Sequence, residues 1–183
     1  MKRALIIGAS GGIGAAMCTH LTSRGMDVVP VSRSIDGFDV TDPASVSDVL
    51  GDLVGPFDMI FVAIGVLGIP EKSLGAIEAD AMADVFAVNA IGPALILKEV
   101  PKLLAKDGVC AVLSARVGSI GDNQIGGWYS YRASKAALNQ IVHGAAIEIG
   151  RSHKNAKVVA LHPGTVETPF TANYAARHKT IPA

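Results

Sequence analysis

The chain has 183 residues, of which half are hydrophobic and 17% are charged, so it fits one domain with a substantial apolar core. This composition excludes an intrinsically disordered chain, which would be rich in charge and poor in apolar side chains. Lys plus Arg and Asp plus Glu both number 16, so the formal net charge is zero, and no basic block exists that would hold a nucleic-acid backbone.

Short apolar runs alternate along the chain with stretches of helical periodicity. Strands are predicted at residues 4–7, 27–32, 38–40, 58–64, 109–114 and 157–162. Helices are predicted at residues 13–24, from 42 onward, at about 79–105 and at 129–149, the last ended by Gly150. This alternation requires crossover connections and a parallel sheet. A single α/β domain is therefore predicted over residues 1–183, a doubly wound parallel β-sheet with helices on both faces.

Cysteine and histidine usage predicts neither a disulfide framework nor a metal site. Cys18 and Cys110 lie far apart, and the five histidines have no metal-ligand spacing. Lys2 and Arg3 precede an apolar stretch too short for a signal peptide. The longest apolar run, at 59–69, is about half the roughly 20 residues that cross a bilayer. A cytoplasmic protein without a membrane partner is expected.

A glycine-rich run, GASGGIG at residues 8–14, lies between the first strand and the first helix. Glycine allows a tight turn, a close approach of the backbone to a diphosphate, and close packing of the helix on the strand. The helix N-terminus then offers free N–H groups to the phosphates. The position of the run predicts a Rossmann-type dinucleotide site with contacts from Gly8, Ser10, Gly12, Ile13 and Gly14, and a tight strand–helix turn without a ligand is the alternative. A P-loop is excluded because no Gly-Lys-Ser/Thr follows.

The residues after the second strand indicate which dinucleotide binds. The sequence there is Ser32-Arg33-Ser34, with no carboxylate before Asp36. A carboxylate would accept hydrogen bonds from the 2′-hydroxyl of NAD, whereas a guanidinium pairs with the 2′-phosphate of NADP. Arg33 therefore favours NADP(H) over NAD(H), and the lack of an acid argues against an S-adenosylmethionine enzyme. A solvated loop arginine is the alternative for Arg33.

Tyr131 and Lys135 lie four residues apart near the start of the last predicted helix, so they share a face. A free tyrosine has a pKa near ~10. A neighbouring ammonium lowers this pKa because it favours the phenolate. The pair is suited to proton exchange with a substrate, although the spacing alone also fits an amphipathic helix with a surface lysine.

Together with the glycine run, this pair resembles the pattern of the short-chain dehydrogenase/reductase family over essentially the whole chain. Asp39-Val40, Asn89, Gly118 and the loop at 163–168 match further motifs in the family's order. Within the family, the stretch at 118–132 is similar to the C-factor and sniffer-type carbonyl reductases.

The resemblance implies hydride transfer between a nicotinamide and a carbonyl or alcohol. Tyr131 would donate a proton to the carbonyl oxygen, Lys135 would hold the ribose hydroxyls and lower the tyrosine pKa, and Asn89 would support a proton-relaying water. It also implies a homodimer or homotetramer. Further cofactor contacts are implied for residues near the strand ends and in the nicotinamide-side loop: Asp39, Val40, Ala63, Ile64, Gly65, Pro163, Gly164, Val166 and Thr168.

The sequence departs from the family in three places. Ala115 occupies the position of the catalytic serine, and Ser114 is favoured slightly over Ser119 as its replacement. Side chains alternate along a strand, so Ser114 would point away from a site facing position 115 unless the strand end is bulged. The asparagine-rich turn after the fourth strand is replaced by VAIG at 62–65. The last strand of the family is expected to be absent, which would leave the sixth predicted strand at an edge.

The expected function is NADP(H)-dependent reduction of a small aldehyde or ketone, with Tyr131, Lys135, Ser114 and Asn89 as catalytic residues. Two alternatives stay open. One is a dinucleotide-binding signalling or regulatory protein with little turnover, which Ala115 favours. The other is a lyase, dehydratase or epimerase on the same scaffold. Only the reductase predicts net oxidation of NADPH.

Overall fold

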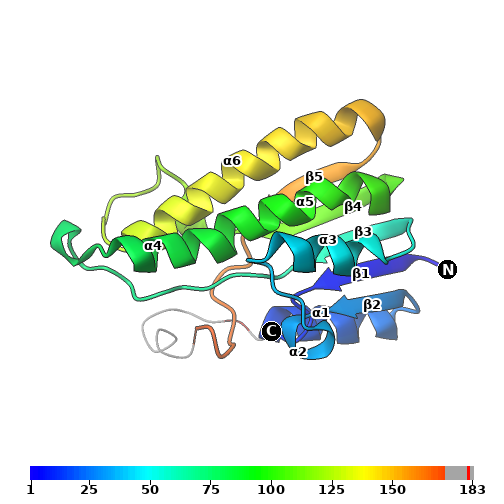
Figure 1. Ribbon diagram of the computed structural model, residues 1–183, viewed down its shortest axis with the longest axis horizontal. Coiled ribbons are helices and arrows are strands. Elements are labelled where there is room, and N and C mark those ends of the chain that lie inside the picture. The colour runs from blue at the N-terminus through cyan, green and yellow to red at the C-terminus, as the bar shows by residue number, and fades with distance from the viewer. Residues whose placement is uncertain (172–180, 182–183) are drawn as a thin grey trace.

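The structure is a computed structural model that describes residues 1–171 and 181. Its five strands form one parallel sheet in the order β2-β1-β3-β4-β5 (Figure 1). The order reverses between β1 and β3, which is the switch point where open α/β sheets bind ligands. The strands are β1 (Arg3–Ile7), β2 (Asp27–Val31), β3 (Phe57–Val62), β4 (Leu104–Leu113) and β5 (Lys157–Leu161).

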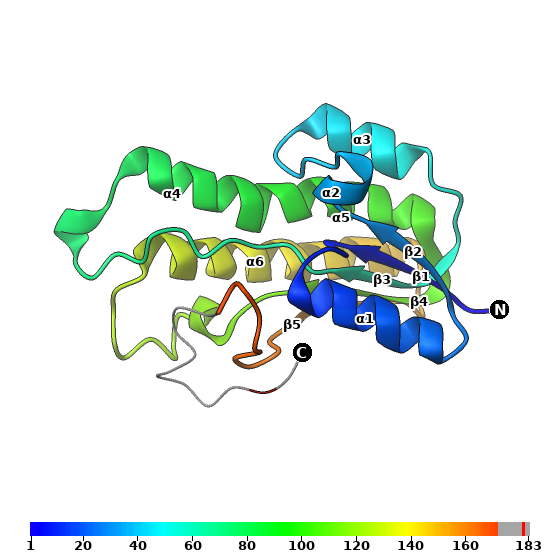
Figure 2. The same cartoon turned by 90° about the horizontal axis from the view of Figure 1, so that it is seen from below.

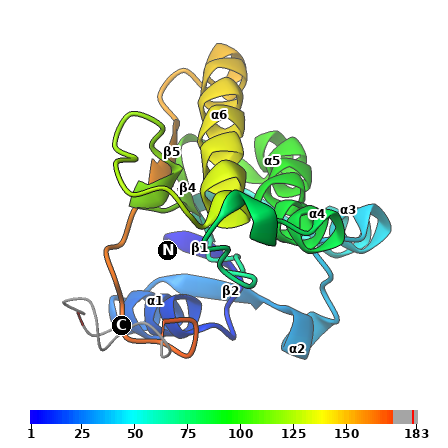
Figure 3. The same cartoon turned by 90° about the vertical axis from the view of Figure 1, so that its left-hand side faces the viewer.

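Helices cover both faces of this sheet. On one face lie α3, α5 and α6, and on the other lies α1 (Figures 1 and 3). Helix α4 and the start of α6 reach past the carboxyl ends of the strands (Figure 2). The predicted doubly wound parallel sheet is therefore confirmed. The helices are α1 (Gly12–Ser23), α2 (Arg33–Asp36), α3 (Pro43–Gly51), α4 (Ala79–Phe86), α5 (Gly92–Leu103) and α6 (Tyr129–Ser152).

Alternate residues of β1 separate two hydrophobic cores. Leu5 and Ile7 belong to the larger core, which α3, α5 and α6 cover. Ala4 and Ile6 belong to the smaller core, which faces α1. All four residues are fully buried. A central strand buried on both faces is expected to have the continuous apolar sequence that β1 shows.

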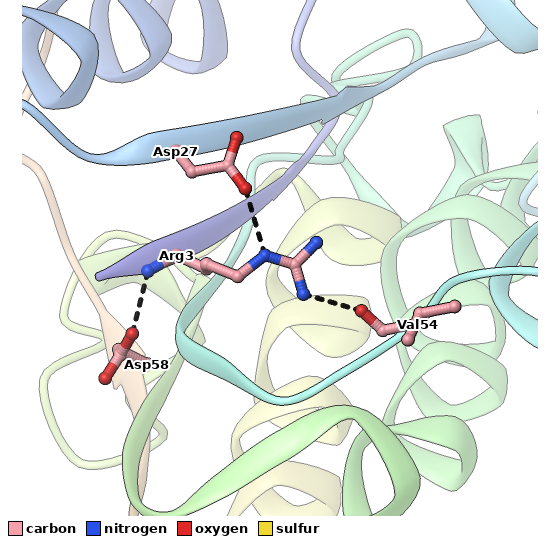
Figure 4. A network of polar contacts seen from close by, with 4 residues as sticks. All are labelled: Arg3, Asp27, Val54 and Asp58. Atoms are coloured by element: carbon pink, nitrogen blue, oxygen red, sulfur yellow. Dashed lines mark hydrogen bonds and ion pairs between the residues drawn. The ribbon is translucent and has the colours of Figure 1, made fainter. Parts of the chain in front are cut away.

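Arg3 joins the amino ends of three strands (Figure 4). Its backbone N–H donates to Asp58 Oδ2 at 2.7 Å, and its Nε donates to Asp27 Oδ2 at 3.0 Å. Its Nη1 donates to the carbonyl oxygen of Val54 at 2.7 Å, and the guanidinium carbon lies 4.5 Å from the centre of the Phe57 ring. These contacts fix the amino ends of the strands. A ligand is expected at the opposite, carboxyl ends.

The strand predicted at residues 38–40 is wrong. Phe38 and Val40 are buried in the larger core, while Asp39 between them is exposed. The segment packs inward as part of the connection to α3 and does not extend the sheet, so β2 is an edge strand, where Pro30 is tolerated. The residues between β2 and this segment form the single turn α2.

Two predicted helix ends also differ from the structure. The helix predicted at 79–105 is α4, a π-helical turn at Ala87–Ile91 and α5, and it stops at Leu103 because β4 has already begun at the next residue. The helix predicted to end at Gly150 continues to Ser152. A glycine ends a helix only where the chain turns away, and here the backbone stays helical.

The continuous helical stretch Ala79–Leu103 is, by length and composition, apolar enough to cross a membrane, with a window of mean hydropathy 1.5. The core helix of a globular domain passes the same test. In this chain Ile96, Leu97 and Val100 lie in the larger core. The buried carboxylate of Glu99 pairs with Lys102 at 2.7 Å. Packing in the core therefore accounts for the apolar side chains of α5.

Candidate functional site

The glycine run forms a tight turn at the carboxyl end of β1, beside the switch point of the sheet. Gly8 has a φ of +90°, and a Cβ there would lie 2.6 Å from the carbonyl oxygen of Ala63, which follows β3. A Cβ on Gly14 would overlap the carbonyl oxygen of Gly8. The N–H groups of Gly8 and Ala9 donate to the carbonyl oxygen of Val31 at 2.8 and 3.1 Å. Only glycine fits at positions 8 and 14.

The N-terminus of α1 is suited to an anion. Gly11 precedes the helix without a side-chain cap, and the first turn has no acidic side chain. The first N–H groups and the positive end of the helix dipole therefore remain available. A Cβ on Gly12 would lie 2.5 Å from Cγ2 of Thr168. The loop at residues 163–168 is therefore in contact with the glycine run. The residues present fit the diphosphate of a dinucleotide.

Ser32 and Arg33 lie where α2 follows the end of β2. This is the place from which they are predicted to contact the ribose of the cofactor. Ser32 is buried and its hydroxyl caps α2, while Arg33 is exposed. Asp36 also reaches this place, because its Oδ2 accepts the backbone N–H of Ser32 at 2.8 Å. The end of β2 therefore carries both a cation and a carboxylate.

Asp39 and Val40 lie near this end of the sheet. Asp39 Oδ1 accepts the hydroxyl of Thr41 at 2.7 Å and its N–H at 2.9 Å. These hydrogen bonds, and to a smaller extent the positive charge of Arg33, lower the pKa of Asp39. Val40 is buried against Gly92 at the start of α5. Arg33 and Asp39 are thus close enough to interact electrostatically.

Tyr131 and Lys135 lie in the first two turns of α6 and are only 8% and 3% exposed. Lys135 Nζ donates to the carbonyl oxygen of Leu113 at 3.0 Å and lies 6.0 Å from the centre of the Tyr131 ring. Burial raises the pKa of Tyr131 to about 12 and lowers the pKa of Lys135 to about 8. The predicted lowering of the Tyr131 pKa is therefore wrong for this structure, because burial disfavours both the phenolate and the cation that would stabilise it.

Asn89 lies in the π-helical turn between α4 and α5 and is fully buried. Its Oδ1 accepts the N–H of Val66 at 2.8 Å, and its Nδ2 donates to the carbonyl oxygen of Val66 at 2.8 Å and to Ser134 Oγ at 3.1 Å. A Cβ on Gly65 would lie 3.3 Å from both Asn89 Oδ1 and Lys135 Nζ. Three of the predicted site residues, Asn89, Lys135 and Gly65, therefore meet at one point.

Gly118 sets how closely the segment after β4 approaches α6. A Cβ there would lie 2.8 Å from the carbonyl carbon of Lys135 and 2.9 Å from its Cβ. The turn that carries Gly118 thus lies directly against Lys135.

Ser114 is not hydrogen-bonded to Tyr131 or Lys135 in the part of the chain that the structure describes. Its hydroxyl donates to Asn139 Oδ1 on α6 at 2.6 Å. Ala115 has extended backbone, so the alternation of β4 continues and its side chain points to the opposite face. Ser119 is exposed. A hollow of about 510 Å³ opens beside these residues, and its lining includes Ser114, Ala115, Ser119, Asn139 and His162.

The segment after β5 passes beside the glycine run. Val166 is buried, forms a parallel bridge with Ile181 and accepts a hydrogen bond from the Thr171 hydroxyl. Phe170 is 42% exposed, and its ring centre lies 6.3 Å from that of Tyr131. The segment therefore approaches both the glycine run, through Thr168, and the tyrosine.

Three residues of this site were not predicted from the sequence. Ser134 binds Asn89 and could have been found, because it lies within the same turn as Lys135. Phe170 gave no signal, since its ring meets that of Tyr131 from a segment far away along the chain. Glu71 binds Ser130, which lies 59 positions further along the chain, and no local pattern announces that contact.

The fold and this site define a dinucleotide-binding oxidoreductase scaffold: a glycine turn at the switch point faces a buried tyrosine–lysine pair. The family model described as Enoyl-(Acyl carrier protein) reductase matches residues 8–183. The chain belongs to the short-chain dehydrogenase/reductase family. The predicted resemblance is confirmed, and the protein is an oxidoreductase by family.

Related proteins cover most of this fold. The 1-hydroxy-2-glutathionyl-2-methyl-3-butene dehydrogenase of Rhodococcus sp. (strain AD45) is 31% identical over 196 residues, 99% of this chain and 85% of the relative. The C-signal protein of Myxococcus xanthus is 34% identical over 116 residues, 62% of this chain and 68% of the relative. A short-chain dehydrogenase/reductase from Burkholderia multivorans, solved with bound NADP, has a TM-score of 0.79 and 26% identity, covering 92% of this chain and 81% of that one.

Proposed function

We propose that the protein is an NADP(H)-dependent oxidoreductase that reduces a small aldehyde or ketone to the alcohol, with Tyr131 as the proton donor. The observation that carries the proposal is the buried Lys135, whose Nζ lies beside Asn89 and Gly65 and 6.0 Å from the Tyr131 ring. A lysine side chain is almost never fully buried unless it is paired with another group. A role in the catalytic pair explains why Lys135 is buried, whereas a surface lysine on an amphipathic helix would be exposed.

The proposed roles follow from protonation and position. A nicotinamide cofactor, when bound, supplies the hydride. Tyr131 keeps its proton at neutral pH, because burial raises its pKa to about 12, and donates it to the carbonyl oxygen as negative charge develops there. Lys135, with a pKa of about 8, still carries its charge at neutral pH and stabilises the tyrosinate. Asn89 Oδ1 accepts the N–H of Val66, and its other lone pair would accept from a proton-relaying water near Lys135.

The surroundings of Tyr131 favour a carbonyl compound with an apolar substituent. The ring centres of Trp128 and Phe170 lie 6.2 and 6.3 Å from that of Tyr131. Val66, beside Asn89, is 38% exposed and adds an aliphatic surface. A substrate whose carbonyl meets the tyrosine hydroxyl would therefore place its remaining atoms among apolar side chains.

The proposed preference for NADP(H) rests on Arg33 after β2. Its guanidinium is exposed, so it can pair with a 2′-phosphate. The Burkholderia multivorans relative that was solved with NADP supports this choice of cofactor. Asp36 at the same strand end is the group that would favour NAD(H), so the two cofactors must be compared directly.

The test is oxidation of NADPH by the purified protein across a panel of aldehydes, ketones and diketones. We expect turnover with the wild type and a loss of about 100-fold or more with Tyr131→Phe, because the phenol is the proton donor. Binding of NADPH, followed by its fluorescence, should be the same in both proteins. Equal turnover of the two proteins would refute the role of Tyr131.

A second candidate, a dinucleotide-binding signalling protein with little turnover, is favoured by one observation. Ala115 stands where the family has its serine, and a relative with 34% identity over 116 residues is the C-signal of Myxococcus xanthus. Tight binding of NADPH without oxidation by any carbonyl would support this candidate. Conversion of a substrate without net oxidation of NADPH would instead support a lyase or epimerase.

We also propose a homodimer or homotetramer. The outer face of α6 carries small side chains next to a hollow of about 560 Å³ whose lining includes Ile120, Ala136, Ala137 and Gln140. Small side chains let a second helix approach closely. Size-exclusion chromatography with light scattering should give a multiple of 18.8 kDa for the wild type and a smaller multiple for Ala137→Arg. A monomeric wild type would refute the proposal.

A further inference from the structure

We infer that Glu71 is a positioning residue for the catalytic pair, because its buried carboxylate binds the loop after β3 to the first turn of α6. The inference rests on the proposed roles of Tyr131 and Lys135. Glu71 is only 8% exposed, although it lies in a loop. In Figure 2 the chain after β3 runs along α6 toward the first turn of that helix before it returns as α4.

The carboxylate of Glu71 caps α6 from a distant segment. The N–H of Ser130 lies 3.2 Å from Oε1 and 3.3 Å from Oε2, and the Ser130 hydroxyl also donates to Oε1. Ser130 is the second residue of α6, where N–H groups have no acceptor within the helix. Trp128, which precedes the helix, does not cap it with its own side chain. Glu71 therefore supplies the cap that the local sequence lacks.

The charge of Glu71 suits this place. Burial raises its pKa, but hydrogen bonds from the Ser130 hydroxyl and from backbone N–H groups outweigh burial and hold the pKa below its usual range. The carboxylate is thus ionised at neutral pH, at the positive end of the helix dipole. Glu78 offers a contrast, because it stands at the start of α4, is exposed and makes no side-chain cap.

The backbone of Glu71 holds the turn that leads into α6. Its carbonyl oxygen accepts the N–H of Trp128 at 2.7 Å. Gly126, Gly127 and Trp128 have φ values of 71°, 65° and 54°, and a non-glycine residue adopts such a value at a cost. From the helix side, Arg132 Nε donates to the carbonyl oxygen of Gly127 at 3.0 Å. The turn is therefore fixed between Glu71 and Arg132.

The same loop reaches the other half of the site. Val66 is bound to Asn89 through its N–H and its carbonyl oxygen, and five residues later Glu71 is bound to Ser130. Tyr131 follows Ser130 directly. The loop thus links Asn89 to the first turn of α6 and sets where Tyr131 lies relative to Gly65. A residue with this role controls the rate of the chemical step more than the affinity for the cofactor.

The experiment compares Glu71→Ala, Glu71→Gln and the matched control Glu78→Ala with the wild type. For E71A we expect kcat to fall about 10- to 100-fold, because misplacing reacting groups by about 1 Å costs rate on this scale. The Kd for NADPH should change less than about twofold, since the glycine run is untouched. E71Q keeps an acceptor oxygen for Ser130 and should recover most of the rate, and E78A should match the wild type.

An unchanged kcat in folded E71A, with only its melting temperature lowered, would overturn the inference, and so would an equal loss in E78A. If E71A does not fold, Ser130→Ala tests the same contact and should also lower kcat without changing the NADPH Kd. A wild type without turnover would refute the proposed function alone. Hydrogen exchange then tests the contact: E71A should exchange faster at residues 126–135 and not at residues 79–103, and unchanged exchange at 126–135 would overturn the inference.

Discussion

Lys135 combines a cost in stability with its role in the site. Burial lowers its pKa from 10.5 to about 8, a difference of roughly 3 kcal/mol between its charged and neutral forms. Lys135→Met removes that cost and loses the hydrogen bond to the carbonyl oxygen of Leu113. We expect the variant to gain about 1–3 kcal/mol in free energy of unfolding at pH 7 and to lose turnover. Urea unfolding and the NADPH assay measure the two effects.

The pH dependence of stability gives the control for this prediction. Between pH 8 and 10.5 the unfolded chain still holds a proton on Lys135 that the folded protein releases, so the stability of the wild type rises with pH there. The raised pKa values of Cys110 and Tyr131 give the opposite slope above about pH 9 and pH 10, so pH 7 to 9 is the window to compare. K135M should lack the rise, and Lys157→Met, at an exposed lysine of β5, should keep it. A wild type with flat stability over this window would contradict the prediction.

Ala115 is the residue where a gain of activity is expected. Ala111 and Leu113 face the α1 side of the sheet, and the extended backbone at 115 continues that alternation. A hydroxyl at 115 would therefore emerge on the side of the glycine run, where it can stabilise charge that develops on the carbonyl oxygen. We expect Ala115→Ser to raise kcat by about tenfold, part of what one such donor contributes in other enzymes.

Ser114→Ala is the matched variant for this gain. The hydroxyl of Ser114 is bound to Asn139 at 2.6 Å, so its removal should leave kcat within about twofold of the wild type. A large loss of kcat in S114A would identify Ser114 as the serine of the site, as the sequence suggested, and would mean that the end of β4 rearranges when substrate binds.

At the level of elements, the activity depends on how closely the segment after β4 packs on α6. In Gly118→Ala the new Cβ would lie 2.8 Å from the carbonyl carbon of Lys135, so the helix must move. We expect a loss of about 2 kcal/mol in stability, typical of overpacking, together with a loss of turnover. Gly121→Ala, where nothing lies within 4 Å of the added Cβ, should change neither. Thermal unfolding measures the change in stability, and the NADPH assay measures the change in turnover. A G118A variant with unchanged stability and turnover would show that α6 is free to shift.

The elements predicted correctly from the sequence are those whose ends depend on nearby residues. Asp42 caps α3 through the N–H of Ala44, with Pro43 in the first turn, and Gly25 follows α1 with a positive φ. The prediction failed at residues 38–40 and at Gly150, where the outcome depends on neighbouring elements. Whether an apolar triplet joins a sheet or packs under a helix is decided by tertiary contacts, which a local pattern does not contain.

The site divides in the same way. The glycine run and the Tyr131–Lys135 spacing are local, so the sequence places them on a turn and on one helix face. The contacts of Ser114 with Asn139 and of Glu71 with Ser130 join residues 25 and 59 positions apart. No periodicity predicts them. The pKa of Tyr131 also depends on burial by segments from the whole chain, which explains why its direction was predicted wrongly.

For the molecule as a whole, the stabilising contacts lie at the amino ends of the strands and the functional site lies at their carboxyl ends. Arg3 ties the amino ends of β1, β2 and β3 together through Asp27 and Asp58. At the carboxyl ends, by contrast, the chain places glycines, an uncapped helix N-terminus and buried titratable groups. Such a site is stabilised less by its own contacts than by what binds to it. The molecule should therefore gain stability from its cofactor.

Thermal unfolding with NADPH and NADH measures that gain. A ligand that binds only the folded state at 100 times its Kd adds about 2.7 kcal/mol, which raises the melting temperature of a domain of this size by roughly 5–10 °C. We expect the larger rise with NADPH, because Arg33 can pair with the 2′-phosphate that NADH lacks. Arg33→Ala should reduce the NADPH rise to that of NADH and leave the NADH rise unchanged. Equal rises in the wild type, or an NADPH preference that survives R33A, would contradict the role of Arg33. A larger rise with NADH would instead mean that Asp36, bound to the N–H of Ser32, selects the cofactor.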